Sequence, residues 1–332
     1  MLSRIRAALV VAAICLVVPH TADAVTLAPP KGKVFAGVAM GYDFKDFTRR
    51  TGRKPAVWEQ FISFDRTFQW AIDLADRADT RLMLAVSTAG GQDQAGTISP
   101  GAIAAGRGDR WLLTVRNAFA AFGRPAYLRF LGEMNNCHNA YAPMTCSGVS
   151  RGSRYSTGAF VAAWRRTAAI MRGSSFGEIN RTLRALHQHR LRAPAVPLVP
   201  ARIAMVWTPM TGGSPMVSAL DPARFWPGSR WVDWVGTSFY SKYPRFDWLS
   251  TYYRRFAQRY GKPFMFAEWA MWENGDPDFA RSVLGWTHEH PLTRMLVYNQ
   301  GKDPDGPFRL KRFPSAASVL RQGLASRRFS VL

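Results

Sequence analysis

The sequence predicts a (β/α)8 barrel in a single domain, on three observations. Short apolar runs alternate with longer amphipathic segments from Val34 onward, which is the pattern of repeated βα units on a parallel sheet. Eight of these runs have the length and composition of strands. The chain has 332 residues, and after loss of a leader of 24 residues it suits one such barrel of about 250 residues plus loops.

The expected strands are rich in β-branched and aromatic residues and are bounded by Gly, Pro or polar residues. They cover residues 34–40, 56–64, 81–87, 126–133, 202–208, 231–240, 264–269 and 294–299. The segments between them place apolar residues at helical spacing. We expect helices over residues 66–77, 110–122, 157–172, 248–260 and 278–288, and a terminal helix over residues 315–325.

Two of the expected strands end in a carboxylate. Glu133 ends the fourth strand and Glu268 ends the seventh. Because side chains alternate along a strand, we expect Arg129 and Leu131 on the face of Glu133, and Phe266 on the face of Glu268. A single Glu at a strand end is usually a solvated rim residue. Since active sites of these barrels form at the C-terminal ends of the strands, the two together are the candidate acid/base pair of an enzyme.

Aromatic residues accompany the same strand ends. Tyr42 follows the first strand, Trp207 lies on the fifth, Tyr240 ends the sixth, and Trp269 and Trp272 end and follow the seventh. Flat aromatic faces stack on the C–H faces of sugar rings, so we expect these residues to bind a carbohydrate, although any one of them can instead be a packing residue. Four other tryptophans fall in helical patterns and are assigned to the core: Trp70, Trp111, Trp164 and Trp286.

The first 24 residues have the features of a secretory signal. Arg4 and Arg6 precede an apolar segment over residues 8–18, and a small-x-small sequence predicts cleavage after Ala24. We therefore expect a secreted or periplasmic monomer whose catalytic domain covers residues 25–332, with no membrane span after cleavage. An uncleaved N-terminal anchor is the alternative.

Two cysteines follow Glu133 in one polar loop. Cys137 and Cys146 are expected to form a disulfide, because an even pair this close in sequence is typical of exported proteins. With one nearby histidine, His138, the pair does not make a metal-ligand set, so we expect no metal.

The formal net charge of +22 suggests an anionic partner such as an acidic polysaccharide, although an Arg-rich composition spread over helix surfaces explains it equally well. No nucleic-acid motif accompanies the basic residues, so we expect no nucleic-acid partner. The glycine-rich pieces lack the spacing of a nucleotide-binding loop, and we expect no cofactor.

Several blocks of the chain are similar to glycoside hydrolase family 26, the family of β-mannanases and related β-glycanases. The blocks are Arg129-x-x-x-Glu133-Met134-Asn135, residues 160–166, Val206-Trp207-Thr208-Pro209, residues 226–228 with 231–236, and residues 261–263 with Ala267-Glu268-Trp269. They lie in the order of the family and span nearly the whole chain after the leader.

The resemblance implies a retaining endo-β-glycosidase, by family default a mannan endo-1,4-β-mannosidase, with Glu133 as acid/base and Glu268 as nucleophile. It also implies that Tyr240 lies against the nucleophile and that Asn135 and Trp207 bind substrate. The nucleophile must stay ionised, which Arg129 and Tyr240 are suited to ensure.

The chain departs from the mannanase pattern beside the acid/base. The studied mannanases carry His immediately before it, whereas this chain has Gly132, so mannan specificity is open. His138 or Tyr141 stands where an aromatic platform is expected. A hydrolase of a bacterial exopolysaccharide or envelope glycan is the close alternative. A non-catalytic carbohydrate-binding barrel and a basic envelope protein held by charge alone are the others.

Overall fold

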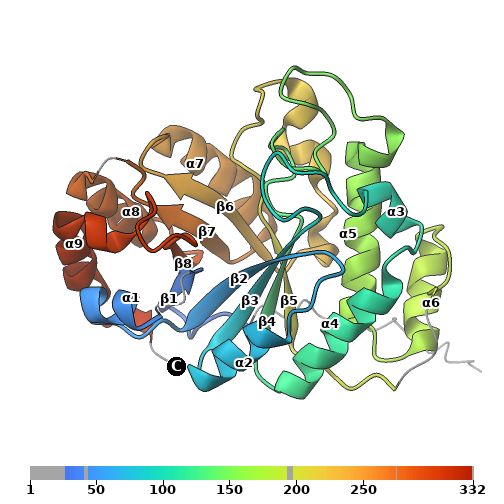
Figure 1. Cartoon of the computed structure of the whole chain (residues 1–332), viewed down its shortest axis with the longest axis horizontal. Coiled ribbons are helices and arrows are strands. Elements are labelled where there is room, and N and C mark those ends of the chain that lie inside the picture. The colour runs from blue at the N-terminus through green and yellow to red at the C-terminus, as the bar shows by residue number, and fades with distance from the viewer. Residues whose placement is uncertain (1–26, 41–43, 193–196, 274, 331–332) are drawn as a thin grey trace, which may run out of the picture.

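The computed structural model describes residues 27–40, 44–192, 197–273 and 275–330, and these residues form a closed parallel barrel (Figure 1). Strands pair in the order β2-β3-β4-β5-β6-β7-β8-β1, and β1 also pairs with β2, which closes the ring. The strands are β1 (Val34–Ala39), β2 (Val57–Ser63), β3 (Arg81–Ser87), β4 (Ala126–Phe130), β5 (Ile203–Trp207), β6 (Trp234–Tyr240), β7 (Phe264–Ala270) and β8 (Thr293–Asn299). A two-residue strand, β9 (Phe329–Ser330), pairs with the start of β1. The predicted barrel is confirmed.

Helices surround the barrel, with α1, α8 and α9 on one side and α4, α5 and α6 on the other (Figure 1). They are α1 (Phe44–Thr51), α2 (Gln69–Arg77), α3 (Pro100–Ala104), α4 (Asp109–Phe122), α5 (Thr157–Arg172), α6 (Phe176–Ala185), α7 (Phe246–Tyr253), α8 (Pro277–Glu289) and α9 (Pro314–Leu324). The predicted helices are confirmed, and their observed N-terminal ends differ from the predicted ones by no more than a few residues. The predicted helix over residues 248–260 is α7 followed by a π-helical turn, Arg254–Gln258.

Local sequence explains several helix boundaries. Pro277 and Pro314 occupy first-turn positions of α8 and α9, where a missing N–H costs nothing. The hydroxyl of Ser156 accepts a hydrogen bond from Ala159 N at the start of α5. Gly123, in the left-handed conformation at φ 68°, ends α4.

The apolar core has two layers. The inner layer fills the barrel and includes Met83, Tyr127, Trp234 and Met265. The outer layer lies between the strands and the helices, and Trp164 of α5 is one of its fully buried members. With the barrel interior filled by side chains, a substrate has room only at its mouth.

The fourth strand is shorter than predicted. β4 ends at Phe130, and Leu131 and Glu133 both adopt the left-handed region, at φ 48° and 52°. The turn is held because Leu131 N donates to Val86 O (2.8 Å) and Glu133 N donates to Thr208 O (2.7 Å). The expectation that Leu131 shares a face with Arg129 is therefore wrong, since Leu131 packs in the outer layer while Arg129 points into the barrel mouth.

The expected alternation in the seventh strand is also wrong. Phe266 packs in the outer layer and Ala267 in the inner layer. Phe266 pairs with Thr237 and Glu268 pairs with Ser238, so β7 carries an extra residue opposite β6. Such a bulge re-aims the side chains that follow it. It allows Glu268 to face the barrel mouth although it lies two residues beyond the outward-facing Phe266.

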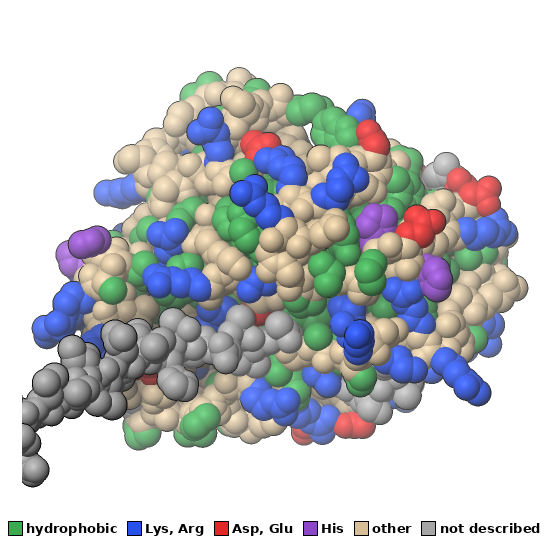
Figure 2. All heavy atoms as spheres, turned by 180° about the vertical axis from the view of Figure 1, so that it is seen from behind, with side chains coloured by type: hydrophobic (Ala, Val, Ile, Leu, Met, Phe, Trp, Pro, Cys, Tyr) green, Lys and Arg blue, Asp and Glu red, His purple; other side chains and the backbone are tan. Residues whose placement is uncertain are grey.

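The predicted disulfide is present between Cys137 and Cys146, with sulfur atoms 2.04 Å apart. The predicted signal segment and Tyr42 lie outside the described residues. No helix in the described ranges is long and apolar enough to cross a membrane. Lys and Arg side chains are spread over the face shown in Figure 2, with few acidic side chains between them, so the net positive charge is not confined to one patch there.

Candidate active site

A cleft of about 1060 Å³ opens at the C-terminal ends of the strands and contains both predicted catalytic carboxylates. Glu133 follows β4 and Glu268 lies in β7. Aromatic side chains form much of the wall: Phe61, Trp70, Tyr141, Phe239, Tyr240, Tyr243, Trp248, Trp272 and Phe308. An elongated polar ligand with apolar faces, such as a glycan chain, fits this lining.

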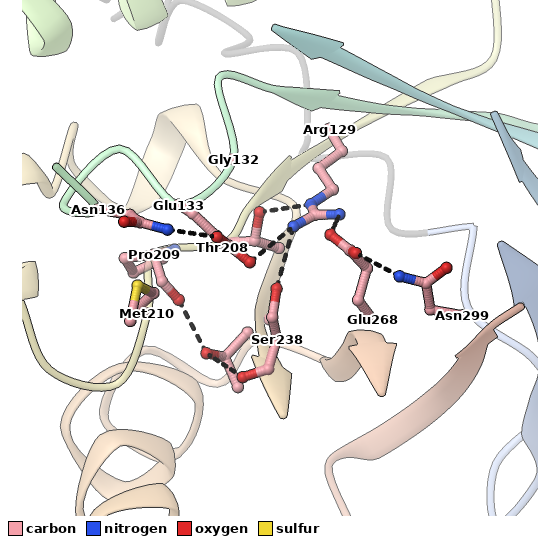
Figure 3. Close-up of polar contacts among 12 residues, drawn as sticks. Arg129, Gly132, Glu133, Asn136, Thr208, Pro209, Met210, Ser238, Glu268 and Asn299 are labelled. Atoms are coloured by element: carbon pink, nitrogen blue, oxygen red, sulfur yellow. Dashed lines mark hydrogen bonds and ion pairs between the residues drawn. The ribbon is translucent and has the colours of Figure 1, made fainter. Parts of the chain in front are cut away.

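Arg129 is the buried centre of the polar network at the cleft floor (Figure 3). Its guanidinium donates to the Glu268 carboxylate and lies 4.0 Å from Glu133 Oε1. Its Nε donates to Thr208 Oγ1 (2.9 Å), and Nη2 donates to Ser238 Oγ (3.2 Å). One fixed cation therefore lies within reach of both carboxylates.

Glu268 is hydrogen-bonded at both oxygens. Arg129 occupies Oε1, while Tyr240 Oη (2.8 Å) and Asn299 Nδ2 (3.0 Å) donate to Oε2. Burial, together with the negative charges of Glu268 and Glu133, raises the pKa of Tyr240 well above its usual value, so Tyr240 remains a donor. Donors therefore reach both oxygens of Glu268 and fix the orientation of its side chain, as an attacking group requires.

Glu133 is less enclosed and has a different set of neighbours. Asn136 Nδ2 donates to its Oε2 (3.1 Å), and its other oxygen faces Arg129. Asn139 Nδ2 donates to its backbone carbonyl (2.9 Å), and the Tyr141 hydroxyl donates to the carbonyl of Gly132. The loop that the disulfide closes thus holds the backbone on which Glu133 sits.

The structure adds a third acid that the sequence analysis missed. Glu59 of β2 is fully buried, and its Oε1 accepts a hydrogen bond from Arg129 Nη1 (3.1 Å). Burial raises the pKa of Glu59 to about 8; Arg129 opposes this shift and the charge of Glu268 adds to it. Burial alone would lower the pKa of Arg129, but the carboxylates of Glu268, Glu59 and Glu133 outweigh it and raise that pKa.

The glycine before Glu133 has a steric reason. A Cβ on Gly132 would lie 2.7 Å from Arg129 Nε and 3.0 Å from Thr208 Oγ1. No side chain fits there while the guanidinium keeps its position. The observed position of Arg129 therefore requires a glycine at residue 132.

The cleft brings together six of the predicted site residues: Arg129, Glu133, His138, Tyr240, Glu268 and Trp272. Three others are buried behind it and do not line it. Asn135 uses its side-chain amide to hold the loop after β5, since Oδ1 accepts from Met210 N and Nδ2 donates to three backbone carbonyls. Trp207 and Trp269 pack in the outer core. Contact between these three side chains and a substrate in the cleft is excluded by their burial.

Trp70 corrects the core assignment of the helical tryptophans. Its side chain is 39% exposed and lines the cleft, whereas Trp111, Trp164 and Trp286 are buried as expected. Trp70 lies in the first turn of α2, directly after the loop from β2. Helical spacing alone did not distinguish a residue at the exposed N-terminal end of a helix from one in its packed middle.

His138 lies beside the disulfide, and its Nδ1 contacts Asp93 Oδ1 (2.9 Å). His138, Cys137 and Cys146 place three possible metal-ligand atoms close together. The two sulfur atoms are bonded to each other, so they offer no thiolates to a metal.

No family model and no curated protein matches the chain. Solved structures do. The fold is shared with β-mannanases of glycoside hydrolase family 26. GH26A from a Muricauda species has a TM-score of 0.57 at 15% identity, with 91% of this chain and 92% of that chain covered.

The Bacillus subtilis mannanase BCman has a TM-score of 0.56 at 16% identity, with 89% of this chain and 87% of that chain covered. BoMan26A, a GH26 β-mannanase from Bacteroides ovatus, has a TM-score of 0.56 at 14% identity and 90% coverage of both chains. The likeness extends over nearly the full length of each protein and concerns the arrangement of the chain.

Proposed function

We propose that this chain is a retaining endo-β-glycosidase that hydrolyses a β-linked polysaccharide, with Glu268 as nucleophile and Glu133 as acid/base. The observation that supports this most is the single buried guanidinium of Arg129 within 4.0 Å of both carboxylates, at the floor of a cleft lined with aromatic side chains. The shared fold with β-mannanases adds to it.

In the first step, a Glu268 oxygen attacks the anomeric carbon while the glycosidic C–O bond breaks. The proton of Glu133 passes to the departing oxygen, so a glycosyl ester of Glu268 and a free sugar hydroxyl result. Arg129, Tyr240 and Asn299 hold Glu268 oriented before the attack.

In the second step, Glu133 takes a proton from water and the resulting hydroxide attacks the same carbon, which releases the sugar and restores Glu268. Esterification removes the negative charge of Glu268, while Arg129 lies 4.0 Å from Glu133 Oε1, so the same cation accompanies the acid/base in both steps.

Mannan is the default substrate by analogy with the structural relatives, and a bacterial exopolysaccharide or envelope glycan is the alternative. Gly132 and the disulfide loop change the surroundings of the acid/base, where a neighbouring sugar would bind. Among the cleft aromatics, Trp272 is a proposed stacking residue, with the exposed Tyr243 in edge contact with it.

We propose further that the protein acts outside the cytoplasm, as a monomer, after removal of residues 1–24. The Cys137–Cys146 disulfide supports an oxidising compartment. Mass spectrometry of the exported protein tests the cleavage site: a mature N-terminus at Val25 agrees with it, and a full-length exported chain contradicts it.

Product release from a panel of neutral mannans, β-glucans and acidic exopolysaccharides tests the proposed activity. We expect Glu268→Ala to lower the rate on the cleaved polymer by on the order of 10³-fold or more. Glu289→Gln, at the exposed end of α8, is the matched control and keeps full activity. Release that is unaffected by Glu268→Ala contradicts the nucleophile assignment, and binding of a polymer without any release favours a non-catalytic carbohydrate-binding barrel.

A further inference from the structure

The cleft carries more positive charge than the proposed reaction uses. Arg66, Arg245 and Lys302 line it together with the catalytic pair. They come from the loops after β2, β6 and β8, so they approach the cleft from different sides of the barrel mouth. Glu133 and Glu268 are the only acids that line it within the described ranges.

These three cations have no acidic partner in the described part of the chain. Exposed cations elsewhere are often paired, as are Lys242 with Glu273 (2.9 Å) and Arg255 with Asp221 (2.8 Å). Arg129, the remaining cation of the cleft, is buried and engaged by Glu59 and Glu268. Arg66, Arg245 and Lys302 are exposed and available to a ligand.

One of the three cations lies over an aromatic face of the cleft, and a second is close in sequence to another aromatic residue that lines it. The Arg245 guanidinium lies over the ring of Trp248, 4.9 Å from its centre. Arg66 and Trp70 are four residues apart and both line the cleft. A sugar ring that stacks on an indole would place a substituent of that ring within reach of the neighbouring guanidinium.

We infer that the substrate is an acidic polysaccharide whose carboxylates are bound by Arg66, Arg245 and Lys302. This inference rests on the proposed glycosidase function and specifies its substrate class. A neutral glycan is bound by stacking and hydroxyl contacts, but it offers no counterion to three positive charges around a cleft. A uronate or another carboxylate-bearing sugar supplies that counterion, and guanidinium groups bind carboxylates with directed hydrogen bonds.

Matched polymers separate the contribution of charge from that of linkage. The probes are soluble β-1,4-glucan and β-1,4-mannan, and the same polymers with part of their 6-hydroxymethyl groups oxidised to carboxylates. An acidic exopolysaccharide and its carboxyl-reduced form make a second pair. Initial rates are measured with the full chain, and equilibrium binding is measured with Glu268→Gln, at low salt and at 1 M salt, where the Debye length is about 3 Å.

We expect the acidic member of a pair to bind about tenfold or more tightly than its neutral counterpart at low salt, and this preference to fall at high salt. The triple variant Arg66→Gln/Arg245→Gln/Lys302→Gln should lose the preference. The triple variant Arg77→Gln/Arg181→Gln/Arg184→Gln removes the same charge from exposed helix positions outside the cleft and should keep it.

Equal binding of acidic and neutral members, or a preference lost equally in both triple variants, overturns the inference. Cleavage of a neutral polymer that requires Glu268, without any acidic preference, overturns the inference and leaves the glycosidase proposal standing. An acidic preference that depends on the three cations, without cleavage of any polymer, contradicts the glycosidase proposal and retains the ligand class. If a sulfated β-glucan binds as well as the oxidised one, the three cations recognise anionic groups in general and the inferred selectivity for carboxylates is wrong.

Discussion

At the scale of single residues, the candidate site depends on how one arginine is shared. Arg129 is buried, and its Nη1 donates to both Glu59 and Glu268. Glu133 lies just beyond hydrogen-bond distance of the same guanidinium (Figure 3). One guanidinium carries a single positive charge, so keeping two buried carboxylates ionised beside it costs free energy. Protonation of Glu59 removes the conflict and leaves the charge of Arg129 to Glu268.

The raised pKa of Glu59 makes a prediction about stability and pH. The folded protein holds this proton up to about pH 8, whereas an ordinary glutamate releases it near pH 4.5. Between these values the folded state binds a proton that the unfolded state releases, so this group makes stability fall as pH rises from about 4.5 to 8. We expect the melting temperature of Glu59→Gln relative to wild type to rise over this range, by about 3 °C or more.

Thermal unfolding at pH 5 and pH 8 measures this difference. Glu289→Gln is the control, because its carboxylate is exposed, and it should show no such trend. A Glu59→Gln advantage that stays constant or shrinks with pH would mean that Glu59 is ionised in the folded protein throughout.

The sequence carries a signal for the buried position of Glu59. It interrupts an apolar strand, as Arg129 does in β4, and the two strands are separated only by β3. Opposite charges in the middle of two near-neighbour barrel strands predict a buried ion pair. Tyr240 and its partner Asn299, by contrast, lie 59 residues apart on β6 and β8, and no local pattern connects them.

At the scale of elements, strand positions were predictable and the directions of the catalytic side chains were not. The apolar runs give the eight strands to within a few residues. Glu133 is placed by a left-handed turn after β4, and Glu268 by an extra residue in β7. Both irregularities involve neighbouring segments, as in the hydrogen bond from Leu131 N to Val86 O of β3 and the register shift of β7 against β6, so alternation along one strand does not reveal them.

The turn after β4 predicts a strong effect from adding one methyl group. In Gly132→Ala the new Cβ would fall 2.7 Å from Arg129 Nε, so the guanidinium that lies within reach of both carboxylates must shift. We expect activity to fall by on the order of 100-fold, since a displacement of about 1 Å near the reacting groups costs this much. Initial rates on the cleaved polymer measure it.

Gly158→Ala is the control for this substitution. Gly158 lies in α5, where the nearest side-chain atom to an added Cβ is 3.8 Å away, so alanine should be neutral or slightly stabilising. Full activity in Gly132→Ala would mean that the position of Arg129 is not needed for the reaction.

At the scale of the whole molecule, the fold is a property of the hydrophobic pattern more than of particular residues. BCman and BoMan26A share only 16% and 14% of their residues with this chain, yet about 90% of it superposes on each of them. Length, strand count and alternation with helices were enough to predict the barrel. Substrate class was not predictable in this way, because it depends on cleft loops that approach one another only in the folded chain.

Because the barrel is closed, we expect a core substitution far from the active site to lower activity by lowering the fraction of folded protein. Leu320 of α9 is fully buried in the outer layer, and we expect Leu320→Ala to lower the free energy of unfolding by about 2 to 5 kcal/mol. Tertiary circular dichroism and activity should be lost at the same, lower temperature, because the barrel unfolds as one unit. Gln322→Ala, on the exposed face of α9, should change neither. Activity lost well below the unfolding temperature would contradict a single cooperative unit.

Azide rescue of the two carboxylate variants on activated aryl β-glycosides is the most direct test of the central claim that Glu268 and Glu133 act as nucleophile and acid/base. In Glu268→Ala, azide should enter the space left by the carboxylate and attack the anomeric carbon from that side. This should restore turnover and give the α-glycosyl azide. In Glu133→Ala, azide should attack the glycosyl-enzyme and give the β-glycosyl azide. Reversed configurations would exchange the two roles, and full activity of either variant without azide would contradict the account.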